Sequence, residues 1–192
     1  MKRLTNKNIN TPELSTKIFK ERWHSLPHYI DWERFKRLAK FFTGGVYVDL
    51  GCFNSPMPYE LKQNFPKAEV FAIDHASEVI ETMNRLLPGP NYICADLLKA
   101  DLDKEVDYIV CGETIEHLHD PQWFINKHMR FLKKGGCFAI STPNNEMTEH
   151  PYDDYEHLWG FTEGDVRGLL KSYGEVQTEI FEGCILAWCY KV

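Results

Sequence analysis

Residues 46–52 read VYVDLGC, and this stretch decides the fold. Its first five residues are a short apolar run with β-branched and aromatic side chains, which predicts a buried strand. An acid, Asp49, and a glycine, Gly51, stand where that strand ends. In an open α/β sheet, the carboxyl end of the first strand is where the backbone comes close to a bound nucleotide. The stretch therefore predicts the first strand of a parallel sheet with a nucleotide-like ligand at its end.

Strand and helix patterns alternate along the rest of the chain. Further apolar runs predict strands at 70–73, 92–95, 106–111 and 137–141. Helical spacing predicts helices at 58–64, 77–87, 121–132 and 162–173. Two last strands, at 176–181 and 184–192, flank Glu182-Gly183 and predict a hairpin. We therefore predict an α/β fold, a Rossmann-like doubly wound seven-stranded sheet with a C-terminal antiparallel hairpin.

The chain before the first strand divides into two parts. Residues 30–42 carry a broadly apolar helical face, with Asp31 as a candidate N-cap, and predict a helix that covers the sheet. Residues 1–29 show no clear periodicity beyond a short helix at 16–23, and we expect them to form an N-terminal arm or lid. Because no linker or repeat interrupts residues 30–192, we expect them to form one domain.

Composition narrows the class of protein. Of the 192 residues, 43% are hydrophobic and 26% charged, as in a soluble globular protein. The net charge of −6 repels nucleic acid and anionic membranes, so a small-molecule substrate is expected. The longest apolar run, 184–190, is far below the roughly 20 residues that span a bilayer. No apolar segment follows the basic first residues, which predicts a cytoplasmic protein whose six cysteines are buried free thiols.

Acids end three of the predicted strands. Asp49 ends the first, Asp74 the second and Asp96 the third. The carboxyl ends of parallel strands meet at one edge of the sheet, where a carboxylate can accept hydrogen bonds from ribose hydroxyls or from an exocyclic amine. A single acid at a strand end is commonly a solvated cap. Three in register predict a ligand site.

With these features the chain resembles the class I S-adenosylmethionine-dependent methyltransferases over residues 30–192, which are thereby predicted to be a methyltransferase domain. That family follows the first strand's acid with GxGxG, and here Phe53 and Ser55 replace the later glycines. The resemblance implies S-adenosylmethionine as cofactor. It also implies a cofactor site, which comprises Asp49, Gly51, Phe53, Asp74, His75, Asp96 and Leu97.

The most specific stretch is 113–121, ETIEHLHDP. It resembles the ExxEHLxDP segment of the family branch that includes ubiquinone-pathway O-methyltransferases and terminal 2′-O-methyltransferases of small RNAs. Glu113, Glu116 and His117 would share one face if this segment were helical. We expect Glu113 at the amino-acid end of the cofactor. His117 and Glu116 are the predicted catalytic residues, with His117 as the base for a hydroxyl group.

A second interpretation places a divalent metal ion on Glu113, Glu116, His117 and His157. Some relatives in the branch use such a set, but the same string in other relatives is only a pocket wall, and we do not favour metal. Residues 144–159 are rich in acids and aromatic residues. If they face the acceptor, they favour a neutral, cationic or metal-bridged substrate.

The leading hypothesis is therefore O-methylation of a small hydroxylated molecule, with nitrogen acceptors as a variant. One alternative is a metal-dependent 2′-O-methyltransferase of RNA termini, which the acidic charge and the lack of a Lys/Arg stripe longer than Lys133-Lys134 weaken. Another is a non-catalytic cofactor-binding module of the same fold, which Phe53 and Ser55 favour slightly. The sequence predicts no membrane partner and no particular oligomeric state.

Overall fold

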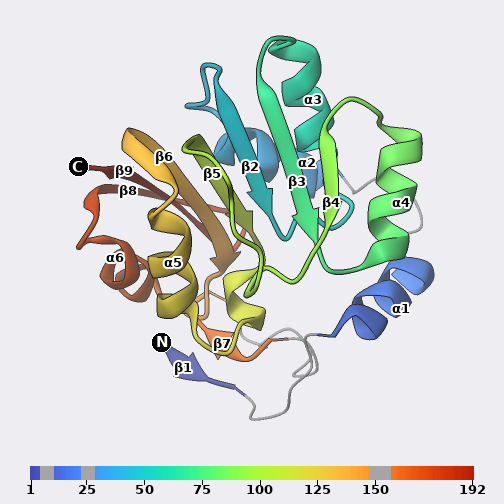
Figure 1. Cartoon of the computed structure of the whole chain (residues 1–192). Coiled ribbons are helices and arrows are strands. Elements are labelled where there is room, and N and C mark those ends of the chain that lie inside the picture. The colour runs from blue at the N-terminus through green and yellow to red at the C-terminus, as the bar shows by residue number, and fades with distance from the viewer. Residues whose placement is uncertain (5–10, 23–28, 148–156) are drawn as a thin grey trace.

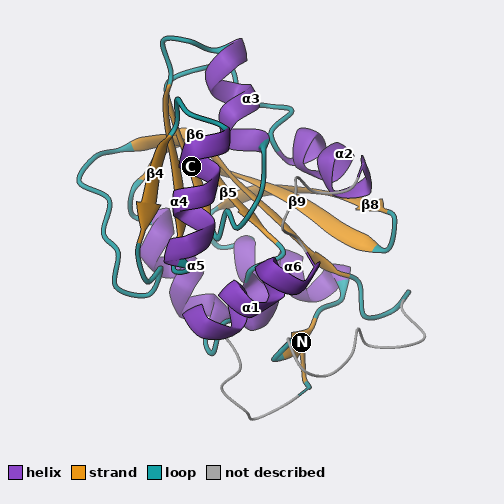
Figure 2. Ribbon diagram, turned by 90° about the vertical axis from the view of Figure 1, so that its right-hand side faces the viewer, coloured by secondary structure: helices purple, strands orange, loops and turns teal. Residues whose placement is uncertain are grey.

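The structure is a computed structural model of the chain, and it describes residues 1–4, 11–22, 29–147 and 157–192. Seven strands form one sheet with helices on both faces (Figure 1, Figure 2). In spatial order these strands are β4 (Asn91–Cys94), β3 (Glu69–Asp74), β2 (Val46–Leu50), β5 (Val106–Gly112), β6 (Leu132–Pro143), β9 (Cys184–Lys191) and β8 (Gly174–Phe181). The strands from β4 to β6 are parallel, and β9 and β8 pair antiparallel. The predicted Rossmann-like sheet with its C-terminal hairpin is confirmed.

Side-chain alternation explains why the central strands are buried on both faces. On β2 and β5, Val48 and Ile109 belong to one core, whereas Tyr47 and Tyr108 belong to the core on the other face. A parallel sheet covered on both faces requires this pattern. The hairpin turns at Glu182-Gly183, where both residues have positive φ angles, 47° and 79°, as a two-residue hairpin turn favours.

Helices cover both faces of the sheet. In chain order they are α1 (Pro12–Arg22), α2 (Tyr29–Leu38), α3 (Met57–Asn64), α4 (Ser77–Leu86), α5 (Pro121–Met129) and α6 (Glu163–Leu170), and one 3-10 turn, η1 (Ile115–His117), precedes α5. Helices α2, α3 and α4 pack on one face, and α5 and α6 lie on the other (Figure 1, Figure 2).

Several helix boundaries differ from the prediction, and α2 and α6 end at Leu38 and Leu170, before the predicted residues 42 and 173. Helix α2 begins at Tyr29, so Asp31 lies inside the helix and is not its N-cap. Helix α5 ends at Met129, because Leu132 already belongs to β6. Helix α1 begins earlier than the predicted 16–23, and residue 23 lies outside the described residues.

The described N-terminal residues touch the domain at two places. Strand β1 (Lys2–Arg3) pairs antiparallel with β7 (Trp159–Gly160). Helix α1 packs on α4, with Phe19 buried between them and an ion pair of 2.7 Å between Lys20 and Glu78 (Figure 1). The division into an arm or lid over 1–29 and a methyltransferase domain over 30–192 stays a prediction.

Two expectations from composition can be compared with the structure. All six cysteines are free, and five are buried. Cys94 is exposed, contrary to the prediction, because it ends the edge strand β4. Within the described parts of the chain, no helix has the length and apolar character that crossing a membrane requires.

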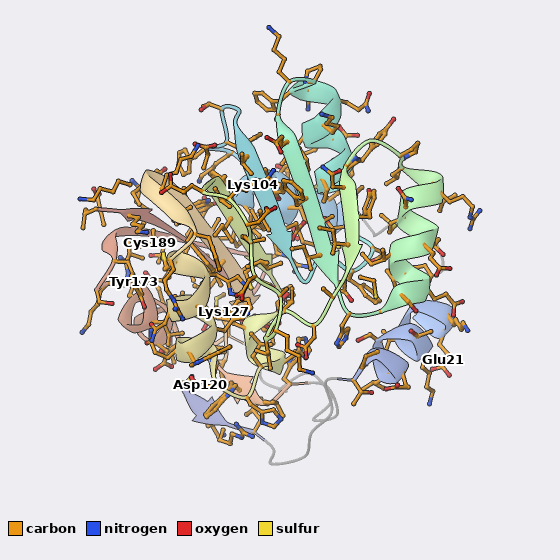
Figure 3. The ribbon with its side chains drawn as sticks, viewed as in Figure 1. Glu21, Lys104, Asp120, Lys127, Tyr173 and Cys189 are labelled. Carbon is orange, nitrogen blue, oxygen red and sulfur yellow. The ribbon has the colours of Figure 1, made fainter. Side chains whose placement is uncertain are left out.

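The topology indicates where a ligand would bind. Strand β2 lies between β3 and β5, so the strand order reverses there. In doubly wound sheets, ligands bind outside the carboxyl ends of the strands at this point. Lys104, which precedes β5, lies at the opposite end of the sheet from Asp120, which follows η1 (Figure 3). A ligand is therefore expected at the Asp120 end of the sheet.

Candidate active site

A cavity of about 530 Å³ opens at the carboxyl ends of the parallel strands. This volume is in the range of small-molecule binding sites. Its wall includes nine of the residues predicted for the site, which are Gly51, Phe53, Asp74, His75, Asp96, Leu97, Glu113, Glu116 and His117. Asp49 is absent from the wall. We refer to Asp74, His75, Asp96 and Leu97 as the β3–β4 end, and to Glu113, Glu116, His117 and His157 as the β5 end.

Asp74 organises the β3–β4 end. Its Oδ2 accepts a hydrogen bond of 3.1 Å from the backbone amide of Phe53, and its Oδ1 accepts one of 2.9 Å from the amide of Ala76. The side chain is buried but lines the cavity. Because each carboxylate oxygen has two lone pairs, both can still accept a donor from a ligand. Asp74 thus fixes the loop after β2 and keeps capacity for a pair of hydroxyl groups.

The rest of the β3–β4 end is held by local contacts and by α1. Asp96 Oδ1 accepts a hydrogen bond of 2.9 Å from the amide of Leu98, and its other oxygen lies 3.2 Å from the Lys99 ammonium. Nε2 of His75 lies 2.8 Å from the Ser15 hydroxyl on α1. Helix α1 therefore forms a wall of the cavity beside His75.

The loop after β2 follows a path that suits glycine. Gly51 has a φ of 80°, and a Cβ there would stand 2.4 Å from Oγ1 of Thr114, so no side chain fits. Phe53 also has a positive φ, 40°, which costs a non-glycine residue about 1–2 kcal/mol. Its ring packs edge-on against Phe19 of α1 at 5.9 Å. Phe53 thus keeps the left-handed backbone that glycine would favour, and it contacts α1.

Glu113 does not share a helical face with Glu116, so that prediction is wrong. Helix η1 begins only at Ile115, and Glu113 has a φ of 49°, which turns its side chain away. Oε1 of Glu113 accepts a hydrogen bond of 2.8 Å from the Ser141 hydroxyl on β6. Oε2 of Glu113 lies 3.8 Å from Nη1 of Arg34 on α2.

Glu116 points to a different set of partners. Its Oε2 accepts a hydrogen bond of 3.0 Å from the Thr142 hydroxyl, and its Oε1 is buried without a hydrogen-bond partner. Oε1 lies 3.8 Å from Nε2 of His117. The side chain is 1% exposed, and burial, followed by the charge of Glu113, raises its pKa well above the usual range. A neutral carboxyl group of this kind can donate or accept a hydrogen bond.

His157 joins this group from the segment before β7. Its ring packs edge-on against that of His117, with centroids 4.8 Å apart. The amide of Leu158 donates a hydrogen bond of 2.8 Å to the backbone carbonyl of Glu116, which fixes the two segments together. Burial lowers the pKa of His157, so its imidazole is neutral at physiological pH.

Three of the four predicted metal ligands converge. One ligand atom each of Glu116, His117 and His157 lies within 4.8 Å of the other two. A carboxylate oxygen and two imidazole nitrogens form a donor set that suits a divalent transition metal. Glu113 does not belong to this group, because Ser141 and Arg34 hold it elsewhere.

Sequence reasoning missed three residues of the site. Arg34 lines the cavity from α2, and its side chain is 12% exposed beside Glu113. Ser141 and Thr142 hold the two glutamates from β6. Their hydroxyls stand in a Ser-Thr-Pro-Asn stretch at the predicted end of a strand, which was the available signal.

Asp49 lies outside the cavity wall, so a direct contact with a ligand in this cavity is not supported. Residues alternate along β2, and the side chain of Asp49 is buried, 2% exposed, with Oδ2 lacking a hydrogen-bond partner. Burial, followed by the charge of Asp74, raises the pKa of Asp49 to about 8. Asp49 therefore lies below the Gly51 loop as a largely neutral acid.

The fold is that of the class I S-adenosylmethionine-dependent methyltransferases. The N-methyltransferase NodS from Bradyrhizobium japonicum, solved in complex with S-adenosyl-L-homocysteine, superposes with a TM-score of 0.73 over 95% of this chain and 98% of its own, at 16% identity. A family model described as "Methyltransferase domain" matches residues 48–140. Residues 48–140 are therefore similar to that family, and the chain has the methyltransferase fold.

The curated relatives are longer than this chain, which covers only part of each. A trans-aconitate 2-methyltransferase from Azoarcus sp. is 29% identical over 57% of this chain and 41% of its own length. A malonyl-[acyl-carrier protein] O-methyltransferase from Priestia megaterium is 22% identical over 82% of this chain and 56% of its own. The chain thus spans about half the length of the curated relatives that it matches.

Proposed function

We propose that the protein is an S-adenosylmethionine-dependent methyltransferase that methylates an oxygen atom of a small hydroxylated molecule. The observation that carries this proposal is the cavity at the strand-order reversal. Its wall has acids that can hydrogen-bond a nucleoside, and it has a cation and an anion that can pair with the charges of an amino acid. S-Adenosylmethionine supplies a methyl group on a sulfonium cation and leaves as S-adenosylhomocysteine once the methyl group has been transferred. The proposal extends to the branch with the ExxEHLxDP segment, which Glu113, Glu116 and His117 support.

The residues present fit this cofactor. Asp74 can accept both ribose hydroxyls, and Asp96 can accept from the adenine amine beside Leu97. Arg34 and Glu113 form a cation and an anion 3.8 Å apart, which complement the carboxylate and the ammonium of a free amino acid. Each of these hydrogen-bonding or charged groups of the cofactor thereby has a complementary acceptor or an opposite charge in the cavity wall.

The β5 end supplies what a hydroxyl acceptor needs. As the acceptor oxygen bonds to the methyl group, its proton must go to a base, and His117 is an imidazole in the wall beside Glu116 that can take it. Most of the rate enhancement in this proposal comes from holding the acceptor in line with the methyl group. A nitrogen acceptor would need less help from the base.

Calorimetric titration with S-adenosylhomocysteine and with 5′-methylthioadenosine tests the cofactor site. The second compound lacks the amino-acid part, so the two together report on the two halves of the cavity. We expect both to bind, with S-adenosylhomocysteine tighter. Failure of both to bind would leave the fold without this activity and favour a non-catalytic module.

The convergence of Glu116, His117 and His157 also supports a second candidate, a metal-assisted methyltransferase. A divalent ion held there would lower the pKa of an acceptor hydroxyl. Titration of the chelated protein with Mn²⁺ and Zn²⁺ separates the candidates: binding that Glu116→Ala abolishes, with turnover lost on chelation, favours the metal. Turnover that survives chelation favours His117 alone as base. Terminal methylation of RNA is the form of this candidate that the net charge of −6 disfavours.

Two further expectations complete the proposal. Helix α1 contacts His75 and Phe53 at the cavity, which supports the role of a lid for the N-terminal arm. Six free cysteines support a cytoplasmic enzyme, because disulfides are rare in that compartment.

A further inference from the structure

Positive charge is scarce around the cavity. Among the described residues that line it, Arg34 is the one Lys or Arg, whereas four acids line it, which are Asp74, Asp96, Glu113 and Glu116. Arg34 already faces Glu113 at 3.8 Å. In the proposed function, the cofactor carboxylate also claims this guanidinium. A second carboxylate, on the methyl acceptor, would therefore find no further Lys or Arg in the described wall.

Two glutamates give the β5 end its negative character. Glu116 is buried in the wall, 1% exposed, and Glu113 lines the same wall. An acceptor carboxylate placed there would lose its hydration and would also be repelled by Glu113. A neutral acceptor meets neither penalty, and a cationic acceptor is attracted by Glu113.

Oε1 of Glu116 also lacks a hydrogen-bond donor, which the methyl acceptor can provide. This atom is buried, belongs to a residue of the cavity wall and has no hydrogen-bond partner. A buried polar atom without a partner costs about 1–3 kcal/mol. An O–H or N–H group on a bound molecule would remove that cost, because Oε2 of the same carboxyl is already held by Thr142.

The sequence around the β5 end is also poor in positive charge. No Lys or Arg occurs from residue 135 to residue 166. This span contains the end of β6, His157 and β7. Residues 148–156, which include four of its acids, lie outside the described residues.

We propose that the methyl acceptor carries no negative charge and presents an O–H or N–H group to Oε1 of Glu116. This inference rests on the proposed function and specifies its acceptor class. It separates this chain from the relatives that are named for trans-aconitate and for the malonyl group of an acyl-carrier protein.

Three small molecules of one shape test the charge preference: benzylamine, benzyl alcohol and benzoate at pH 7.5. Each is titrated calorimetrically into the full chain saturated with S-adenosylhomocysteine. We expect benzylamine and benzyl alcohol to bind at least about tenfold more tightly than benzoate. Benzoate binding as tightly as the others, or no measurable binding of any of the three, overturns the proposal.

The variant Glu116→Gln tests the residue. It keeps the shape and an oxygen for Thr142 but places an NH2 donor where Oε1 would accept, so the preference for benzylamine over benzoate should fall at least about threefold. Glu175→Gln, an exposed acid on β8, serves as the matched control and should leave the preference unchanged. A preference that Glu116→Gln does not alter overturns the assignment to Glu116. The affinity for S-adenosylhomocysteine, measured first, distinguishes failure of this inference from failure of the proposed function.

Discussion

The two ends of the cavity hold their acids in different ways. At the β3–β4 end, Asp74 and Asp96 accept hydrogen bonds from backbone amides of Phe53, Ala76 and Leu98. These amides belong to the loops that follow β2, β3 and β4. Backbone amides favour the ionised carboxylate and survive most side-chain changes. The β3–β4 end is therefore a robust site whose geometry the strand ends themselves provide.

At the β5 end, hydroxyl side chains on β6 donate hydrogen bonds to the acids in place of backbone amides. Ser141 and Thr142 are neighbours on β6, and because strand side chains alternate, their hydroxyls reach different glutamates. Ser141 holds Glu113, which faces Arg34, and Thr142 holds Glu116, which faces His117. In the proposed function, this pair of adjacent residues separates Glu113, which serves the cofactor, from Glu116, which serves the acceptor. Single substitutions should disturb this end selectively.

The largest expected effect is on turnover at the β5 end. His117→Ala removes the proposed base, so the rate of methyl transfer should fall by about 100-fold. The affinity for S-adenosylhomocysteine should stay within about twofold of wild type, since no cofactor contact is lost. The rate is measured as S-adenosylhomocysteine release with the acceptor that a screen of hydroxylated molecules identifies. A large loss of cofactor affinity would place His117 at the wrong end of the cavity.

Asp74→Ala should affect the β3–β4 end and weaken the binding of both adenosine-containing ligands. Loss of the ribose acceptor and of the Phe53 contact should weaken S-adenosylhomocysteine and 5′-methylthioadenosine alike, by about 1–3 kcal/mol, as measured by calorimetry. Asp103→Ala, an exposed acid before β5, is the control and should bind both as wild type does. If only S-adenosylhomocysteine were weakened, Asp74 would serve the amino-acid part.

Removing either of the two β6 hydroxyls should give a smaller effect, on cofactor affinity in one case and on turnover in the other. Ser141→Ala should weaken S-adenosylhomocysteine by about 1 kcal/mol and leave 5′-methylthioadenosine unchanged, because Glu113 faces only the amino-acid part. Thr142→Val should leave both affinities unchanged and lower turnover severalfold, and Thr142→Ser should restore it. Equal weakening of both ligands by Ser141→Ala would indicate a general distortion and remove the distinction between the two ends.

This contrast also explains how much could be predicted from the sequence. The strands, and Asp74 and Asp96 at their ends, follow from local patterns, because parallel strands bring their carboxyl ends to one edge. The partners of Glu113 depend on the register that sets Gly112 beside Ser141 and on the packing of α2, and no local pattern encodes either. The positive φ of Glu113 broke the helical spacing on which the shared face was predicted.

The last expected effect is on stability, and it concerns Asp49, the predicted cofactor residue that lies outside the wall. The folded protein keeps its proton up to about pH 8, whereas an exposed aspartate releases it near 3.8. The stability that this group contributes is therefore complete below about pH 4 and is lost as the pH rises to 8. Asp49→Asn removes this dependence.

Urea unfolding at pH 5, 6, 7 and 8 measures that effect. The free energy of unfolding of Asp49→Asn, relative to wild type, should rise with pH by up to about 1.4 kcal/mol per pH unit. Asp103→Asn should run parallel to wild type, because that side chain is exposed. Parallel curves for Asp49→Asn would mean that Asp49 is ionised in the folded protein. Its charge would then belong to the cavity's electrostatics, and the β3–β4 end would hold three carboxylates where we count two.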